Sequence, residues 1–379
     1  MNLKRLKSVV IAATIAVTLN NHATASDKSA PVDVVFTLDL SGSTNGLIDD
    51  VRDKIWDMNN ELSRLGNAGT IRYAVVGYGR PSFGSKNQFV KVLCPLTTDV
   101  DFLAGELYKL NPNIEKGDQL MGAAIRASVE LLNWSKEKGA VKEMFITGNG
   151  SAFLGSFNLQ VSCELAKSHG ISIHPLYCTA SLRARDIGGW NFIADFFNNK
   201  TTDIKIHKRL PEFSTVQDNN RLRELATELS KTYIYYGKNG LANYKTMMSN
   251  EKNALRAGAS TYEAMMYHKI SDQYQGHQSN WDLVDFIKSR NGNLKNVDPK
   301  TLPDSLKNIN PEQLLTKLIE LKEKRNYLIS QLRQLLPYNR QDAVNAFYAT
   351  KTDEGAMIFD RVVMTTLQAK ISGAELAVN

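Results

Sequence analysis

The sequence has few cysteines and no long apolar stretch, and both absences limit what the chain can be. Its three cysteines, among 379 residues, lack the spacing of metal ligands. The apolar run Val9–Leu19 has about 11 residues, fewer than the roughly 20 that a bilayer-spanning helix needs, and no other run approaches that length. With 42% hydrophobic and 22% charged residues, the composition is that of a globular protein with a large core. We therefore expect no membrane span in the mature chain and no cysteine-based metal centre.

The signature motifs of common enzyme classes are also missing. The chain has no Gly-x-Ser-x-Gly elbow, no His-Glu-x-x-His helix, no phosphate-binding loop and no Cys-x-x-Cys pair. Its six histidines are scattered, and the predicted topology places none of them near Ser41, a serine that could be considered as a nucleophile. We therefore expect a binding protein and not an enzyme.

The first 25 residues are typical of a secretory signal peptide. Lys4, Arg5 and Lys7 precede the apolar run, and the small-x-small segment Ala23–Ala25 follows it as a cleavage site. We predict cleavage near Ala25 and a secreted or periplasmic location. Removal of the three basic residues lowers the formal charge from +7 to +4, and basic and acidic residues are interspersed in the rest of the chain. A nucleic acid partner is therefore not expected.

Hydrophobic patterning predicts an α/β domain at residues 30–210. Short β-branched runs alternate with helical patterns, and Val34-Val35-Phe36 is a continuous apolar run; both are typical of a mainly parallel sheet with helices on both faces. We predict strands at Val32–Asp39, Ile71–Tyr78, Phe89–Leu93, Val141–Thr147, Ile171–Tyr177 and Asp203–Ile206. We predict helices near Leu47–Leu65, Val100–Leu110, Leu120–Trp134, Leu159–His169 and Trp190–Phe197.

Long amphipathic patterns replace the strands in residues 211–379, so we predict a helical C-terminal region. Its helices are expected at Arg221–Tyr235, Leu241–Gln273, Pro311–Leu336 and Gly355–Ala374. Asn310 before Pro311 is typical of a helix start, with asparagine as the N-cap and proline at the first helical position. One stripe of that helix carries Leu314, Leu318, Leu321, Leu328 and Leu332. We favour packing within the region over a coiled coil with a partner.

Polar residues follow the first predicted strand in the order Asp39-Leu40-Ser41-Gly42-Ser43. In open α/β sheets, ligands bind at the carboxyl ends of the strands. This Asp-x-Ser-x-Ser turn offers one carboxylate and two hydroxyls, and such oxygen ligands suit a hard divalent cation such as Mg²⁺. The alternative is a structural role, in which Ser43 or Thr44 caps the following helix and Asp39 hydrogen-bonds the turn.

The turn resembles the metal-ion-dependent adhesion site (MIDAS) of the von Willebrand factor type A (VWA) domain family, which is built on an Asp-x-Ser-x-Ser loop. The resemblance implies a Rossmann-like VWA domain with further ligands in two later loops. Asp118 falls where the family has a threonine or aspartate, and Asn149 stands where it has an aspartate. The metal ligands implied are Asp39, Ser41, Ser43, Asp118 and Asn149. Because asparagine brings no charge, we expect Mg²⁺, Mn²⁺ or Ca²⁺ to bind weakly or, in a degenerate site, not at all.

The resemblance extends to secreted bacterial proteins that pair a VWA domain with a C-terminal helical region. It covers about Val32 to Leu336 and includes Gly189-Trp190-Asn191-Phe192 and Asn280-Trp281-Asp282-Leu283. It implies protein–protein binding, in adhesion or envelope assembly, in which an acidic side chain of the partner completes the metal shell. The alternative is a metal-independent scaffold protein that binds through its helical region.

The odd number of cysteines leaves two arrangements open in an oxidising compartment. Cys94, Cys163 and Cys178 could form one bridge and one thiol, or remain three buried thiols. Cys163 lies in a predicted helix and Cys178 at the end of the next predicted strand. A bridge between them requires Cα atoms within about 7 Å.

Overall fold

A computed structural model describes most of the chain. It covers residues 30–44, 46–65, 69–110, 114–178, 186–205, 216–276, 278–289, 293–336 and 357–372. The predicted signal peptide, residues 1–25, lies outside the described residues, as does the side chain of Ser43.

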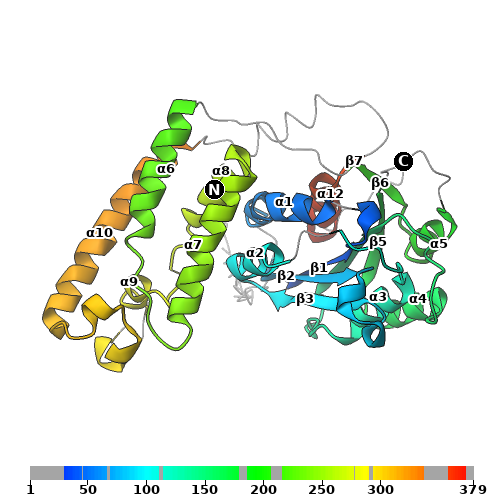
Figure 1. Ribbon diagram of the computed structural model, residues 1–379, viewed down its shortest axis with the longest axis horizontal. Coiled ribbons are helices and arrows are strands. Elements are labelled where there is room, and N and C mark those ends of the chain that lie inside the picture. Colours follow the sequence, from blue (N-terminus) through cyan, green and yellow to red (C-terminus); the bar gives the residue numbers. More distant parts are fainter. Residues whose placement is uncertain are drawn as a thin grey trace, which may run out of the picture.

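Within the described residues, a seven-stranded sheet forms the centre of the α/β part (Figure 1). Its strands are β1 (Val32–Asp39), β2 (Ile71–Tyr78), β3 (Val90–Thr97), β4 (Val141–Gly148), β5 (Ser172–Cys178), β6 (Thr202–Lys205) and β7 (Met357–Ile358). Their order is β3-β2-β1-β4-β5-β6-β7, and every neighbouring pair is parallel except β2 and β3. The first six strands follow the doubly wound order of Rossmann folds. The predicted fold class, a mainly parallel α/β sheet followed by a helical region, is confirmed.

The central strand β1 is buried on both faces of the sheet. Val34, Val35 and Phe36 have no exposed surface. Val35 belongs to the core on one face, whereas Val34 and Phe36 belong to the core on the other. Both faces therefore need a covering layer, which explains the uninterrupted apolar run.

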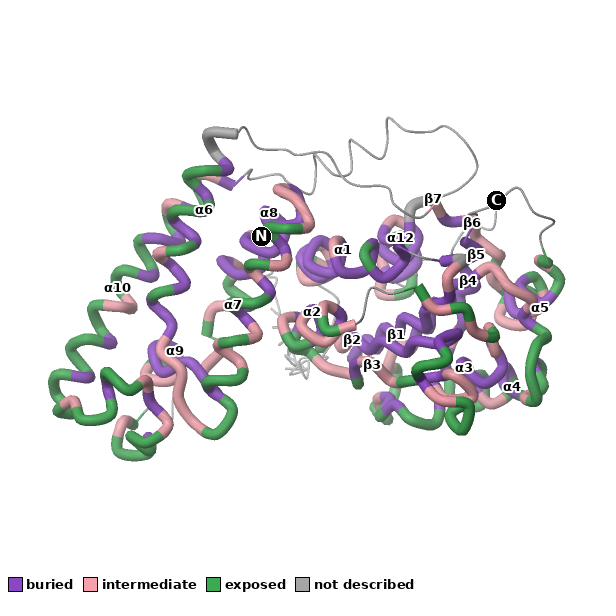
Figure 2. The backbone as a smooth tube through the Cα atoms, in the orientation of Figure 1, coloured by how far each residue is buried: buried purple, intermediate pink, exposed green. Residues whose placement is uncertain are grey.

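Helices cover the two faces in separate layers (Figure 1). One face is covered by α3 (Met121–Glu130), α4 (Leu159–Ser168) and α5 (Gly188–Phe196). The other face is covered by α1 (Leu47–Leu62), α2 (Val100–Tyr108) and α12 (Phe359–Ser372). Figure 2 shows α1 buried along most of its length, because further helices pack on its outer side.

The helical region lies against the layer of α1 and α2. It contains α6 (Val216–Ser230), α7 (Gly240–Ala257), α8 (Ala259–Lys269), α9 (Leu283–Phe286) and α10 (Pro311–Leu335). Asn60 Nδ2 of α1 donates to the Ala264 backbone oxygen of α8 at 3.0 Å, and Asn250 Nδ2 of α7 donates to the Asp101 backbone oxygen of α2 at 2.8 Å. Among the described helices, none combines the length and apolar character needed to cross a membrane.

Two predictions for the helical region have different outcomes. The predicted helix Leu241–Gln273 is wrong, because α7 and α8 are separate helices. Gly258 between them has a φ of +140°, a backbone conformation that favours glycine and interrupts a helix. The predicted start of α10 is confirmed, since Asn310 Oδ1 accepts from Glu312 N at 2.8 Å and Pro311 is the first helical residue.

The C-terminal described segment returns to the sheet. β7 pairs in parallel with β6, and α12 packs beside α1. Lys54 Nζ of α1 lies 3.2 Å from Asp360 Oδ1 of α12, and both side chains are buried. Residues 357–372 therefore lie with the sheet and its helices, although they fall within the predicted helical region 211–379. A division of the chain into two separate domains at residue 210 stays a prediction.

The possible bridge between Cys163 and Cys178 is not formed in the structure. Both residues, like Cys94, are buried free thiols. Cys163 belongs to the core beneath α3 and α4, whereas Cys178 belongs to the core on the opposite face of the sheet. The sheet therefore separates the two sulfur atoms, and the alternative of three buried thiols describes the structure.

Candidate functional site

The chain leaves the sheet in opposite directions after β1 and β4, which are neighbours in it. β1 leads to β2 on one side and β4 leads to β5 on the other, so their loops separate at the usual ligand position of open α/β sheets. Asp39 is the last residue of β1, and Asn149 directly follows β4. The short turn Gly42–Thr44 lies between β1 and α1, as predicted.

The place where the β1 and β4 loops separate is called the switch point below. Asp39 is a fully buried carboxylate there. Its Oδ1 accepts a hydrogen bond from the Ser41 backbone N–H at 2.9 Å. Its Oδ2 has no hydrogen-bond partner among the described residues. Burial, opposed by hydrogen bonds within the turn, raises the pKa of Asp39 to about 6. A buried carboxylate oxygen without a hydrogen bond is costly unless a proton or a cation compensates it.

Hydrogen bonds also stabilise the turn itself. The structural role of the motif and its metal-binding role are therefore compatible. Thr44 Oγ1 donates to the Asp39 backbone oxygen at 2.8 Å and lies 3.1 Å from the Ser41 backbone oxygen. The N-cap of α1 is Gly46, which makes no side-chain cap hydrogen bond, so Thr44 does not cap this helix. The predicted ligand Ser43 has its side chain outside the described residues.

Gln119 lies between the predicted ligands, although no sequence motif marked it. Its Nε2 donates to Ser41 Oγ at 2.8 Å and to Asn149 Oδ1 at 3.3 Å. The neighbouring Asp118 is exposed, and no hydrogen bond joins its side chain to Asp39, Ser41 or Asn149 in the described part of the chain. The structure therefore places Gln119, and not Asp118, in hydrogen-bond contact with Ser41 and Asn149, and Asp118 as a metal ligand stays a prediction. Adjacent side chains of a non-helical loop point in different directions, and here the glutamine faces the site.

Two glycines allow the backbone to approach Asp39 closely. A Cβ on Gly79, whose φ is +83°, would lie 2.9 Å from Asp39 Oδ1. A Cβ on Gly148 would lie 2.6 Å from the Tyr78 hydroxyl oxygen and 3.2 Å from Asp39 Cβ. The Tyr78 hydroxyl donates to the Thr147 backbone oxygen at 2.7 Å. The position of the carboxylate is thus fixed by close packing on two sides.

The residues present fit a hard divalent cation that receives little charge from the protein. Asp39 Oδ2, Ser41 Oγ and Asn149 Oδ1 are oxygen donors of the kind that Mg²⁺ takes. Asp39 supplies the carboxylate of this set, because Asn149 is neutral and Asp118 is exposed. In the described ranges, no group of three or more His, Cys, Asp and Glu side chains could hold a metal. From these described residues, a cation would therefore receive one carboxylate and two neutral oxygens.

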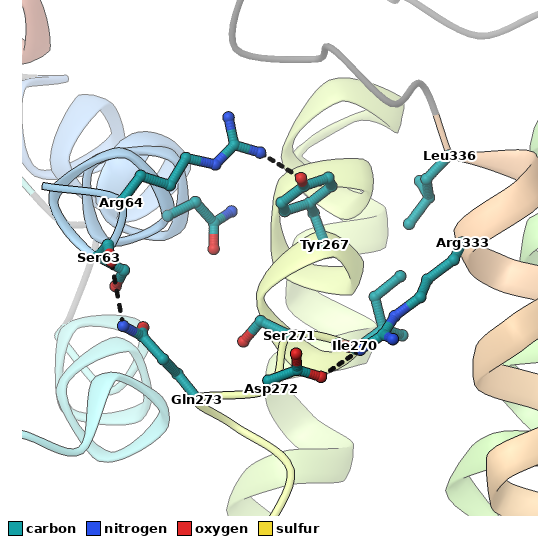
Figure 3. Close-up of a pocket in the computed structure, with 10 residues that line it drawn as sticks. Ser63, Arg64, Tyr267, Ile270, Ser271, Asp272, Gln273, Arg333 and Leu336 are labelled. Carbon is teal, nitrogen blue, oxygen red and sulfur yellow. Dashed lines mark hydrogen bonds and ion pairs between the residues drawn. The ribbon is translucent and has the colours of Figure 1, made fainter. Parts of the chain in front are cut away.

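A hollow of about 400 Å³ lies where α1, α8 and α10 meet (Figure 3). Arg64 lies 5.1 Å from the centroid of the Tyr267 ring and donates to the Tyr267 hydroxyl. Arg333 donates to Asp272 Oδ1 at 2.6 Å. Each arginine in this hollow thus already has a partner, and none of the predicted site residues lines it. We therefore assign the site to the switch point.

No family model and no curated protein match this sequence. Solved structures match at low identity. The chain is similar to BatB, a conserved hypothetical protein from Bacteroides thetaiotaomicron, with 15% identity and a TM-score of 0.35, covering 53% of this chain and 98% of that one. It is similar to the SpRpn10 VWA domain, with 14% identity and a TM-score of 0.33, covering 47% and 90%. It is also similar to proximal thread matrix protein 1 from the mussel byssus with a zinc-occupied MIDAS motif, with 17% identity and a TM-score of 0.31, covering 40% and 37%.

The α/β part has a VWA-like fold. Its own strand order and the Asp-x-Ser-x-Ser turn at the switch point carry this assignment, since the TM-scores of the matches are low. The predicted first loop follows β1 and the predicted third loop follows β4. The second predicted loop, which contains Gln119, lies between them in space.

Proposed function

We propose that this chain binds a protein partner through the loops at the carboxyl ends of β1 and β4, with a divalent cation at their centre. The observation that supports this most is the buried Asp39 carboxylate, whose Oδ2 has no hydrogen-bond partner among the described residues. A cation would compensate this oxygen. Because a single carboxylate does not neutralise a divalent cation, the site would keep a positive charge and attract an acidic side chain.

Asp39, Ser41 and Asn149 would hold the cation, and we propose the Ser43 hydroxyl as a further ligand. When bound, the cation supplies a positive charge that a carboxylate of the partner can contact. Mg²⁺, Mn²⁺ and Ca²⁺ all accept such oxygen ligands. The partner's carboxylate would then replace the acid that the VWA resemblance implies at Asn149.

Exposed apolar side chains beside the loops support a protein as the partner. Ile114, Phe153 and Leu154 are 60%, 59% and 49% exposed. A Cβ on Gly42, in the Asp-x-Ser-x-Ser turn, would lie 2.7 Å from Ile114 Cγ2, so Ile114 borders the site. Protein interfaces commonly combine apolar contacts with a polar or charged anchor. We propose no nucleic acid partner, because these side chains bring no positive charge.

We propose that the chain binds and does not catalyse a reaction. Ser41 Oγ faces Gln119 Nε2, a hydrogen-bond donor that cannot act as the general base a nucleophile needs. We also propose a secreted or periplasmic location and a role in adhesion or envelope assembly, on the basis of the signal-peptide pattern in residues 1–25.

A metal-independent scaffold that binds through the helical region is the second candidate function. Helix α10 carries Leu315, Ile319 and Tyr327 at 43%, 46% and 61% exposure, although its predicted stripe, apart from the half-buried Leu321, is buried. The Gln119 amide also favours this candidate, because a donor already satisfies Ser41 and Asn149 without a cation.

Capture of envelope or culture-medium proteins on the immobilised full-length chain distinguishes the two candidates. The metal-dependent proposal predicts that EDTA and Asp39→Ala each remove the partner, whereas Asp195→Ala, at an exposed aspartate of α5, has no effect. The scaffold candidate predicts loss of the partner in the double variant Leu315→Ser and Ile319→Ser. A partner that survives both EDTA and Asp39→Ala would refute the metal-dependent proposal.

A further inference from the structure

The loop that carries Gln119 is wedged between neighbouring loops. A Cβ on Gly117 would lie 2.5 Å from the Gly79 backbone oxygen, so these two backbones are in close contact. Glu115 accepts hydrogen bonds from Ser82 N at 2.9 Å and from Ser82 Oγ at 2.7 Å. Glu115 also pairs with Ser41 as a parallel β-bridge. The backbone of residues 114–120 therefore has little room to move when a ligand enters.

The Gln119 side chain fills the space between the β1 and β4 loops. Its Nε2 hydrogen-bonds Ser41 Oγ and Asn149 Oδ1, two of the neutral oxygens proposed to hold the cation. Its Oε1 lies close to Gly150 of the β4 loop, since a Cβ on that glycine would lie 1.8 Å from this atom. The amide –NH₂ thus presents its partial positive charge to these oxygens, as a cation would.

We propose that Gln119 is an internal competitor of the divalent cation, whose amide must leave Ser41 and Asn149 before the cation can use both oxygens. This inference rests on the proposed function, since it requires a cation site. The wedged backbone leaves side-chain rotation as the route by which Gln119 departs. Any contact that holds Gln119 in the departed position raises the affinity for the cation, so a partner that binds its amide would promote cation binding.

Titration of the full-length chain with Mn²⁺, followed by the loss of the free-ion electron paramagnetic resonance signal, tests this proposal. Gln119→Leu keeps a side chain of similar size but removes the donor. Gly150→Ala keeps Gln119 and all proposed ligands, but its Cβ must displace Gln119 Oε1. Gln160→Leu is the matched control, because Gln160 is an exposed donor on α4 that hydrogen-bonds Glu164 at 2.9 Å.

We expect Gln119→Leu to bind Mn²⁺ on the order of tenfold more tightly than the unmodified chain, because two hydrogen bonds no longer oppose the cation. Gly150→Ala should shift the affinity in the same direction, and Gln160→Leu should leave it unchanged. Asp39→Ala should abolish binding in every background.

Two other results would overturn the inference in different ways. If Gln119→Leu and Gly150→Ala bind Mn²⁺ as the unmodified chain does, or more weakly, while Asp39→Ala abolishes binding, then Gln119 is no competitor and the proposed function stands. If neither the unmodified chain nor Gln119→Leu binds Mn²⁺ more tightly than Asp39→Ala, there is no cation site, and both proposals fail.

Discussion

Replacement of Arg325 by methionine should destabilise the chain strongly, because this side chain sits at the centre of a buried polar network. Arg325 is fully buried in α10, and its Nη1 donates to Asp282 Oδ2 at 2.6 Å and to Asp285 Oδ1 at 3.1 Å. Its Nε donates to Thr232 Oγ1 at 3.0 Å, and its Nη2 to the Thr232 backbone oxygen at 2.7 Å. The guanidinium carbon lies 4.0 Å from the centroid of the Tyr233 ring.

The size of the effect follows from the two carboxylates that remain. The side chains of Asp282 and Asp285 are 0% and 1% exposed. Loss of one partner from a buried ion pair costs about 3–5 kcal/mol, because the remaining charge stays in a medium of low polarity. We therefore expect Arg325→Met to lower the free energy of unfolding by about 4 kcal/mol. Adding Asp282→Asn and Asp285→Asn should recover part of this loss, since the amides are neutral.

Urea unfolding of the full-length chain, followed by circular dichroism, measures these changes. Arg333→Met is the matched control on the same helix, because Arg333 is 48% exposed and pairs with an aspartate that is 93% exposed. The free energy of unfolding of Arg333→Met should fall by about 1 kcal/mol or less. Equal losses in Arg325→Met and Arg333→Met would contradict the reasoning, as would a triple variant no more stable than Arg325→Met.

Three further predictions concern other parts of the structure. Burial lowers the pKa of His268 from 6.5 to about 4, although the negative charge of the nearby Asp99 acts to raise it. Between these pH values, the unfolded chain therefore binds a proton that the folded chain does not. The contribution of His268 to stability should therefore fall by up to about 3 kcal/mol as the pH drops through this range, so urea unfolding should show the unmodified chain losing stability relative to His268→Gln. Asn149→Asp adds a second carboxylate to the site and should raise the calorimetric affinity for Mn²⁺ at least about tenfold; an unchanged affinity would place residue 149 outside the cation site. Lys54→Met removes the cation that faces Asp360 and should destabilise the chain by about 3 kcal/mol in thermal unfolding, whereas a loss near zero would mean that this pair does not fasten α12 to α1.

The sheet and the position of the site were predictable from local sequence signals. The apolar run at Val34-Val35-Phe36 reflects burial on both faces, and β1 lies in the centre of the sheet. The polar turn after this strand marks the carboxyl edge of the sheet, so the sequence alone places Asp39 at that edge. Such signals are local, because they depend on strand burial and turn chemistry alone.

The remaining features depend on contacts between distant segments. Gln119 faces the site only because its loop packs against Gly79 and Gly150, which are far from it in sequence. The return of α12 to the sheet depends on its packing with α1, and an amphipathic pattern does not reveal which surface a helix covers. Helix and strand order likewise does not show that Cys163 and Cys178 point to opposite faces of the sheet.

Calorimetric titration of the full-length chain and of Asp39→Ala with Mg²⁺ and Mn²⁺ tests the central claim most directly. The account predicts one cation bound by the unmodified chain and none by Asp39→Ala, because the orphaned Asp39 oxygen is the only proposed ligand that carries charge. Equal heats in the two proteins, or no binding by either, would contradict a cation site at the switch point.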